Sequence, residues 1–352
     1  MTLHIFNPEH DIALASYKQF FTPPHAARKL RDDLGFLPAI WGQDGDAVLA
    51  DNKADSQYEF MKLKSSMASI GIKHERYIQF IEPSEIKDND IKDISPWGWD
   101  NSLVYRCRQQ GIDEDCLPTS DELDNIRLLS HRKTSIPLLK ELRNIENTIG
   151  ESYLCYTLDE IIQMQENLEN IVIKAPWSSS GRGLRFGIGC LTDHQKGWIK
   201  NMLVKQGVLI VEPYYKKVMD FGMEFFKQPD GSLRYYGLSL FDTHNGSYIG
   251  NLLATEEKKR EIMSRVCDMV LVDSIKDQTC KILPNIIKDY AGPIGIDMMV
   301  LHNGIIHPCV EINLRRTMGH VAISMSPTDD DIQRAMRIEI INNKYKLKIR
   351  HL

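Results

Sequence analysis

Two carboxylates and one amide in the C-terminal part of this 352-residue chain are suited to hold a divalent cation. Asp297 interrupts the apolar residues 295–301, and a carboxylate is seldom buried in such a strand unless it is paired or binds a metal. Glu311 and Asn313 stand two apart, so they share one face of the strand expected there. Such hard oxygen ligands suit Mg²⁺, with water and phosphate oxygens completing the shell. The alternative is an ordinary hairpin that turns all three side chains to solvent, which the apolar neighbours of Asp297 disfavour.

The metal hypothesis depends on the pairing register of these two strands. Directly opposed residues of an antiparallel pair lie on the same face, and a slip of one residue reverses one set. A regular two-residue turn at residues 303–304 would put Asp297 and Glu311 on opposite faces. A three-residue loop, or a bulge at Pro308, would put both carboxylates on one face. The sequence therefore predicts an odd loop or a bulge between residues 302 and 308.

A strand that ends in a lysine and runs into a loop of small residues could cover phosphates. Lys174 ends the apolar residues 171–174, and serines and glycines follow it. Glycines let backbone N–H groups approach an anion closely, and serines add hydroxyl donors. The loop has neither the GxxxxGK[ST] pattern nor the GxGxxG pattern, and taken alone it also fits a flexible surface turn. The residues expected to cover phosphates are Ser179, Ser180, Gly181, Arg182 and Gly183.

A further carboxylate stands where it could contact the rest of a nucleotide. Residues 208–215 read as a buried strand that carries Glu212 near its end and is stopped by a proline. A carboxylate there could accept hydrogen bonds from an adenine amino group or from ribose hydroxyls, and Asp220 follows shortly after. The alternative is a solvated strand end, which is the interpretation we favour for Glu224.

The first third of the chain supplies elements of a different kind. Residues 3–6, 37–41 and 47–50 read as short strands, and residues 57–70 have the apolar spacing of a helix. Strands that alternate with helices predict a small parallel α/β domain.

The loop at residues 7–11 is the best candidate for contact with an acceptor substrate, because parallel sheets usually meet ligands at the carboxyl ends of their strands. Arg106 and Arg108 are candidate partners for a substrate carboxylate. Asn-Pro and Asp are also ordinary turn formers, so a structural loop is an equal alternative.

The pattern changes near residue 118. Thr119 and Glu122 form a capping-box signature, and the helix that starts there is expected to run through His131 until Pro137 interrupts it. From there to residue 341, strands joined by Gly-rich turns, with a few helices, predict an α+β arrangement. We expect three units: residues 1–118, residues 119–206 with the phosphate-covering loop, and residues 207–352 with the metal site.

Composition limits the class of protein. Hydrophobic residues make up 42% and charged residues 26% of the chain, which is ordinary for a folded soluble protein. The net charge of −5 argues against nucleic acid as a partner, and no apolar run reaches bilayer length. Seven dispersed cysteines and no leader-like N-terminus favour reduced thiols in the cytoplasm. The alternating basic residues 344–350 read as an edge strand.

In this order, the three segments resemble those of the ATP-grasp superfamily, in particular its carboxylate–amine and carboxylate–thiol ligases. The resemblance covers roughly residues 120–340, and residues 1–118 take the place of the α/β domain that usually precedes the catalytic core. The expected fold is therefore an α/β N-terminal domain followed by α+β ATP-grasp-type catalytic domains. One departure from the peptide-forming members is Gly295, where some of them carry an arginine two residues before the first metal carboxylate.

The resemblance implies a role for each motif. Lys174 would contact the phosphates of ATP, Glu212 would lie at the adenine end, and Asp220 would lie near the ribose. Lys133 would be a second nucleotide-binding lysine. Arg315 would stabilise the transferring charge. The Mg²⁺ ligands would be Asp297, Glu311 and Asn313.

The activity that follows is an ATP- and Mg²⁺-dependent ligase, which activates a small-molecule carboxylate as an acyl phosphate for attack by an amine or a thiol. A small-molecule kinase of the same fold is one alternative, and a nucleotide-binding module without turnover is another. No nucleic acid or membrane partner is expected. The identity of both substrates stays open, as does the oligomeric state, a homodimer included.

Overall fold

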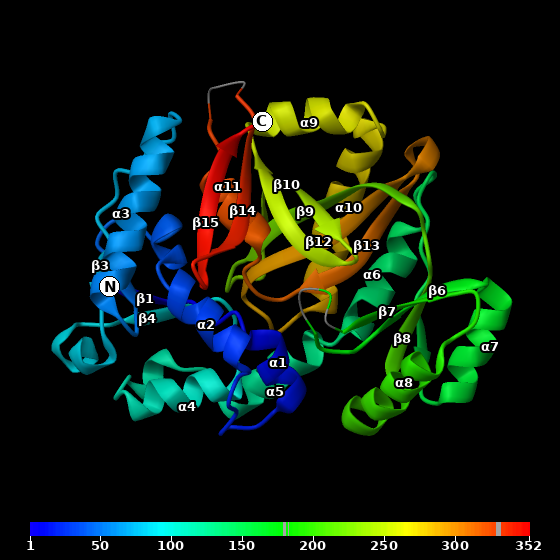
Figure 1. The fold of residues 1–352 in the computed structure, drawn as a ribbon, viewed down its shortest axis with the longest axis horizontal. Helices are drawn as coiled ribbons and strands as arrows, with labels where there is room; N and C mark the ends of the chain where they lie inside the picture. The colour runs from blue at the N-terminus through cyan, green and yellow to red at the C-terminus, as the bar shows by residue number, and fades with distance from the viewer. Residues whose placement is uncertain (179–180, 182, 329–331) are drawn as a thin grey trace.

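The computed structural model describes residues 1–178, 181, 183–328 and 332–352. Within these ranges the chain forms three β-sheets, of four, seven and four strands, each with its own helices. Figure 1 shows the N-terminal unit in blue beside strands β14 and β15, and the second four-stranded unit in green on the other side. In the part of the chain described, no helix is long and apolar enough to cross a bilayer. All seven cysteines are free thiols.

The N-terminal unit is a parallel α/β domain, as the sequence predicts. Its sheet has the order β3-β2-β1-β4, and all three pairings are parallel. The strands are β1 (Thr2–Ile5), β2 (Ala47–Leu49), β3 (Gln79–Ile81) and β4 (Asp93–Pro96). The helices are α1 (His10–Ser16), α2 (His25–Leu34), α3 (Lys53–Ser69) and α4 (Asn101–Gln109), with 3₁₀ turns at Leu37–Ile40, Pro83–Asp88 and Glu114–Cys116.

The strand expected at residues 37–41 is wrong, because this segment forms the 3₁₀ helix Leu37–Ile40. Pro38 has no N–H to offer to a sheet ladder, and its fixed φ suits the first turn of a helix. The segment is nevertheless fully buried, which explains its apolar, strand-like composition.

Two helices connect the N-terminal unit to the rest of the chain. The predicted capping box is confirmed: Thr119 caps α5 (Ser120–Leu129), and Glu122 returns the hydrogen bond. The helix ends before His131, and after the 3₁₀ turn Arg132–Thr134 a new helix, α6 (Ser135–Leu142), begins. Pro137 does not interrupt a helix; it lies in the first turn of α6, where a missing N–H costs no hydrogen bond.

The second unit is an antiparallel sheet of order β5-β8-β6-β7. Its strands are β5 (Tyr153–Cys155), β6 (Asn170–Lys174), β7 (Leu184–Ile188) and β8 (Leu209–Pro213), and its helices are α7 (Leu158–Leu168) and α8 (Asp193–Gln206). Because β8 pairs with β5 and β6, the unit extends beyond the boundary expected after residue 206.

The third unit is a seven-stranded antiparallel sheet of order β13-β12-β9-β10-β11-β14-β15. The strands are β9 (Lys217–Lys227), β10 (Leu233–His244), β11 (Ser247–Leu253), β12 (Gly292–Leu301), β13 (Ile306–Asn313), β14 (Arg334–Ile341) and β15 (Lys344–His351). Its helices are α9 (Glu256–Ser264), α10 (Met269–Ile286) and α11 (Met318–Ser324), and the 3₁₀ turn His302–Gly304 joins β12 to β13. The basic segment at residues 344–350 forms the edge strand that the sequence predicts.

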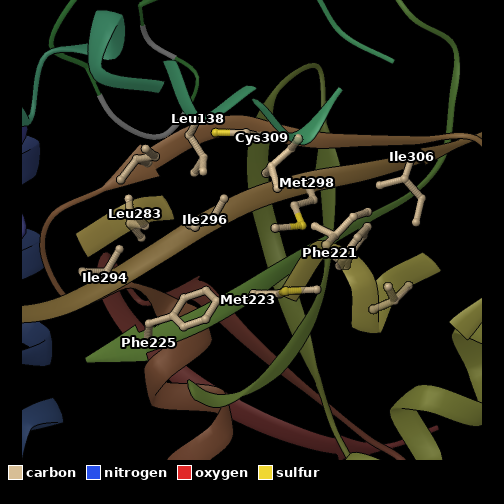
Figure 2. Packing of buried hydrophobic residues seen from close by; sticks show 14 of the residues in the cluster. Leu138, Phe221, Met223, Phe225, Leu283, Ile294, Ile296, Met298, Ile306 and Cys309 are labelled. Carbon is tan, nitrogen blue, oxygen red and sulfur yellow. The ribbon is translucent and has the colours of Figure 1, made fainter. Parts of the chain in front are cut away.

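One face of the large sheet is the centre of the main hydrophobic core. Phe221, Met223 and Phe225 of β9 lie directly opposite residues of β12 and are fully buried. Figure 2 shows these three side chains packed with Leu138 of α6 and Leu283 of α10. Helices α6 and α10 therefore cover this face, which leaves the other face free for a site.

A second core joins the N-terminal unit to the far end of the large sheet. Phe6 and Trp97 belong to the same cluster as Val321 of α11, Met336 of β14 and Leu347 of β15. This packing places the loops that follow β1 and β4 at the free face of the large sheet.

Candidate functional site

A single cleft of about 670 Å³ receives side chains from all three units. Pro8 and Asp11 enter it from the N-terminal unit, Lys174 and Glu212 from the second sheet, and Asp297 from the large sheet. Clefts of this size between domains are where small molecules usually bind. The three motifs of the sequence therefore meet in one place.

The predicted register of the metal hairpin is confirmed. Asp297 lies directly opposite Glu311, so both carboxylates share the cleft face of the large sheet. The odd loop is the 3₁₀ turn His302–Gly304, which lies between the paired residues Leu301 and Ile305. A bulge follows between Asp297 and Met299, where the partner strand β13 carries the extra residues. Loop and bulge together bring the two carboxylates face to face.

Glu311 is held by an arginine that the sequence interpretation missed. Nη2 of Arg132 donates to both carboxylate oxygens of Glu311, at 2.8 and 2.7 Å. The same guanidinium donates through Nη1 to the carbonyl of Ala175 and the hydroxyl of Ser178, at 2.7 and 2.8 Å. Arg132 thus ties the metal hairpin to the start of the phosphate-covering loop.

Asp297 lies in an environment that disfavours its negative charge. Desolvation, and after it the charges of Glu311 and Glu224, raise the pKa of this carboxyl to about 7. Arg315 and a 3.3 Å hydrogen bond from Asn313 oppose the rise only in part. A cation between Asp297 and Glu311 would remove this repulsion.

The donor set fits Mg²⁺ in chemistry. Asp297, Glu311 and Asn313 supply two carboxylates and one amide oxygen, and Mg²⁺ in nucleotide enzymes usually takes few protein ligands besides water and phosphate. A carboxylate has about four lone-pair positions, so the arginine on Glu311 leaves acceptor capacity for a metal. Within the described ranges, no cluster of three or more His, Cys, Asp or Glu side chains has a metal-binding arrangement. Assignment of these three residues as metal ligands stays a prediction.

Arg315 enters the cleft beside the metal residues and is positioned by the N-terminal unit. Its Nε donates to both oxygens of Asp11, at 3.2 and 3.0 Å, and its Nη2 donates to Oδ1 of Asn313 at 2.9 Å. Asp11 lies at the end of the 7–11 segment, so this segment reaches the site as expected, through an arginine of the large sheet.

Two other residues of that segment, Asn7 and Glu9, are structural. Asn7 is fully buried and donates to the carbonyl of Gly98 at 2.7 Å, while Glu9 pairs with Arg31 at 2.5 Å. The two arginines proposed as partners of a substrate carboxylate lie elsewhere. Arg106 lies 3.7 Å from Glu9, and Arg108 binds Glu114 on the surface. Neither lines the main cleft.

Lys174 and Glu212 lie together on neighbouring strands. Nζ of Lys174 is 2.5 Å from Oε2 of Glu212 and donates to the carbonyl of Val310 at 3.2 Å. Both side chains are buried and line the cleft. Lys174 is predicted to contact phosphate and Glu212 to contact adenine. When a nucleotide binds, their ion pair must therefore either open or be shared with the nucleotide.

The phosphate-covering loop is described only in part. Ser179, Ser180 and Arg182 lie outside the described residues. Gly181 lines the cleft with a positive φ of 71°, and a Cβ built on it would lie 2.5 Å from the carbonyl oxygen of Gly246. Glycine at 181 therefore lets the loop approach the turn between β10 and β11. The carbonyl of Gly183 accepts from the N–H of Ala175 at 2.8 Å, which closes the base of the loop.

Of the two remaining residues predicted to bind nucleotide, Asp220 lies in the cleft and Lys133 does not. Asp220 lines the cleft, accepts from Thr243 Oγ1 at 2.8 Å and contacts Lys217. Lys133 is exposed and is not among the cleft residues, whereas its neighbour Arg132 is. In a 3₁₀ turn consecutive residues point about 120° apart, so Arg132 reaches the cleft while Lys133 points to solvent.

The solvated position expected for Glu224 is wrong. This residue of β9 is 2% exposed and lines the cleft. Its Oε2 accepts from Thr317 Oγ1 at 2.8 Å and lies 3.0 Å from Nδ1 of His320. The β9 strand continues through the middle of the sheet, so Glu224 is not at a strand end.

Comparisons with known proteins address the fold. No protein-family model and no curated protein sequence matches the chain. Among solved structures, the biotin carboxylase domain dimer of Hydrogenobacter thermophilus 2-oxoglutarate carboxylase, with MgADP, ADP and bicarbonate, aligns at a TM-score of 0.55 and 12% identity, over 96% of this chain and 74% of that one.

Two further structures agree. The biotin carboxylase of Campylobacter jejuni, in its β,γ-ATP complex, aligns at a TM-score of 0.52 and 11% identity, over 96% of this chain and 75% of its own. The N5-carboxyaminoimidazole synthetase of Staphylococcus aureus, complexed with ADP, aligns at 0.50 and 14%, over 97% and 83%. With the parallel first sheet, the two antiparallel sheets and the cleft between them, these likenesses show that the chain has the ATP-grasp fold.

Proposed function

We propose that this protein is a Mg²⁺- and ATP-dependent ligase that activates a carboxylate as an acyl phosphate for attack by an amine or a thiol. The observation that carries the proposal is the pairing of Asp297 with Glu311 on the cleft face, together with Arg315 and Lys174 in the same cleft. Each of these charges has a use in phosphoryl transfer, and a module that only bound a nucleotide would not need all of them.

Phosphoryl transfer requires alignment and neutralisation of charge more than covalent catalysis. Asp297, Glu311 and Asn313 would hold Mg²⁺, which supplies charge neutralisation at phosphate oxygens when bound. Lys174 would bind the phosphates of ATP from the second sheet, and Arg315 would stabilise charge that develops on the transferred group. Asp11 keeps the guanidinium of Arg315 in place from the N-terminal unit.

The other end of the cleft suits the nucleoside. Glu212 of β8, Tyr214 just after β8 and Phe186 of β7 line it from the two sides of β6, and Phe186 packs edge-on against Tyr214 with ring centroids 5.9 Å apart. Such a slot suits a flat base with an amino group for Glu212 to accept from. Asp220, on β9, would contact the ribose.

The similar structures support the use of ATP. Their names include ADP, MgADP and a β,γ-ATP complex, and one also holds bicarbonate, a small carboxylate-like anion. The fold of this chain is the same, so a nucleotide and a small-molecule carboxylate are the substrates we propose. We also propose the cytoplasm as its compartment, supported by the free state of all seven cysteines.

Release of ADP tests the function. Purified protein is incubated with Mg-ATP and a panel of small carboxylates, each paired with ammonia, amino acids, polyamines or thiols. We expect ADP release that requires both a carboxylate and an acceptor, with equal amounts of ADP, phosphate and condensed product. A stable phosphorylated acceptor without free phosphate would instead show a kinase, and absence of release with every pair would contradict the ligase.

A further inference from the structure

The carboxylate of Glu224 lies in the cleft beyond the metal residues and has no task in nucleotide binding. On β9, Asp220, Gly222 and Glu224 point to the same face, two residues apart, so each step along the cleft is about 7 Å. Gly222 lies opposite Asp297. The strand therefore passes from the proposed ribose position, under the metal residues, to Glu224 on the far side.

Three glycines make room for this carboxylate. A Cβ built on Gly319 would lie 1.9 Å from Oε1 of Glu224, one on Gly295 would lie 2.7 Å from Oε2, and one on Gly222 would lie 3.2 Å from Oε1. The first two distances are too short for a Cβ unless Glu224 moves, and the third would require a small shift. Gly295 is the position at which an arginine stands in some members of the superfamily, and here a carboxylate fills that space instead.

The two oxygens of Glu224 have different surroundings. Oε2 accepts from Thr317 Oγ1 at 2.8 Å and lies 3.0 Å from Nδ1 of His320, whose Nε2 lies 3.2 Å from the carbonyl of Phe225. Thr317 and His320 therefore fix the carboxylate from one side. Among the residues that the structure describes, none donates a hydrogen bond to Oε1. Oε1 is thus a preset acceptor that a ligand can use.

The surroundings indicate the kind of ligand. Ser239 and Asn251 continue a polar floor across β10 and β11, joined by a 2.8 Å hydrogen bond. Met318 and Ile338 line the same cleft and are apolar. A buried carboxylate with a free oxygen calls for an N–H donor, and the apolar neighbours favour a carbon skeleton attached to it.

We propose that Glu224 binds the amino group of the acceptor substrate through Oε1, and that the acceptor is a primary amine carried on a small apolar skeleton. This inference rests on the proposed ligase function and names its acceptor class. The amine would then lie next to Asp297 and Arg315, on the side of the metal residues opposite the nucleotide. Thr317 and His320 act as positioning residues for the carboxylate.

Binding of n-butylamine tests the subsite without any turnover. Saturation-transfer NMR is recorded on the protein with Mg-ADP, for the wild type, Glu224→Gln and Gly319→Ala. We expect the wild type to bind n-butylamine, and both variants to weaken it at least tenfold. n-Butanol is the matched neutral ligand, whose signal should change less than twofold. Equal n-butylamine affinity in the wild type and Glu224→Gln would overturn the proposal.

The matched control variant is Glu256→Gln. Glu256 accepts from the Tyr235 hydroxyl and the Leu238 N–H behind the cleft, and it does not line the cleft. We expect this variant to bind n-butylamine as the wild type does. Calorimetric titration of Mg-ADP, unchanged in all variants, shows that each is folded; an equal loss of n-butylamine binding in Glu256→Gln would mean a general structural effect and would contradict the subsite.

Kinetics separate this inference from the ligase function. With a carboxylate that supports ADP release, Glu224→Gln should raise the KM for n-butylamine at least tenfold and leave the KM for ATP within twofold. If ADP release requires an acceptor but the KM for n-butylamine is unchanged, the ligase stands and the subsite is wrong. If no pair releases ADP while the NMR difference persists, the ligase is wrong and the amine subsite stands.

Discussion

One face of strand β9 belongs to the hydrophobic core and the other lines the cleft, although the residues of the two faces alternate along one short sequence. Phe221, Met223 and Phe225 point to the core and are 0% exposed. Asp220 and Glu224 point to the cleft. The neighbouring strand β12 repeats the division, because each of its residues lies directly opposite one of β9.

The comparison shows how one sheet can supply both stability and chemistry. The core face loses water completely and is stabilised by apolar burial, so its members must be large and well packed. On the cleft face, the glycines 222 and 295 leave space for ligands and carboxylates. We therefore expect substitutions to separate by face: those on the core face should cost stability, and those on the cleft face should cost activity.

The largest effect is expected for Asp297→Asn on the cleft face. Loss of one of the two facing carboxylates should lower kcat/KM for ADP release roughly 10,000-fold, which corresponds to about 5.5 kcal/mol. The matched control is Ile296→Leu, the preceding residue on the core face, which is fully buried and does not line the cleft; it conserves volume and should change activity less than about threefold. Activity of Asp297→Asn within tenfold of the wild type would contradict the metal assignment.

The second effect concerns the core face. Phe225→Ala should lower the free energy of unfolding by about 3–5 kcal/mol, because it leaves a cavity in a fully buried layer. Urea denaturation measures this change. Activity per folded molecule should stay within about threefold of the wild type. A destabilisation below about 1 kcal/mol would show that the two faces are not separated as described.

The third prediction concerns stability against pH in EDTA, where no divalent cation is bound. Because the pKa of Asp297 is raised from 3.8 to about 7, the folded state binds more protons than the unfolded state in this range. Its contribution is complete below pH 3.8 and is lost as the pH rises through 7. Asp297→Asn should therefore be more stable than the wild type at pH 8, by on the order of 2 kcal/mol, and not at pH 4.

Thermal unfolding of the two proteins at both pH values measures this difference. Added Mg-ADP should narrow the gap at pH 8, because a cation next to Asp297 favours its charged form. If the wild type were as stable as the variant at pH 8 without Mg²⁺, the cleft would not disfavour the negative charge of Asp297.

The smallest effect is expected for Asp11→Asn. This substitution leaves the side chain in place but removes the charge that holds Arg315, so kcat should fall about tenfold with little change in the KM for ATP. Asp32→Asn, in the same unit but outside the main cleft, is the control and should have wild-type kinetics. An unchanged kcat for Asp11→Asn would mean that Arg315 is positioned by the end of β13 alone, through Asn313.

The sequence by itself determined the features that depend on neighbouring residues. The capping box at Thr119 follows from a short residue signature, and the edge strand near the C-terminus and the shared face of Asp297 and Glu311 follow from local periodicity. Register could be predicted because side chains on a strand alternate with a period of two, so the position of a loop or bulge can be argued from the hydrophobic pattern.

Only the tertiary structure decided which distant side chains meet. Arg132 reaches Glu311 across 179 residues, and Asp11 reaches Arg315 across 304. Lys133 was expected to bind nucleotide and Glu224 to lie at a solvated strand end, and the structure places neither there, because exposure depends on what packs against each residue. These partners are set by the packing of three units around one cleft, and no local pattern in the chain encodes that packing.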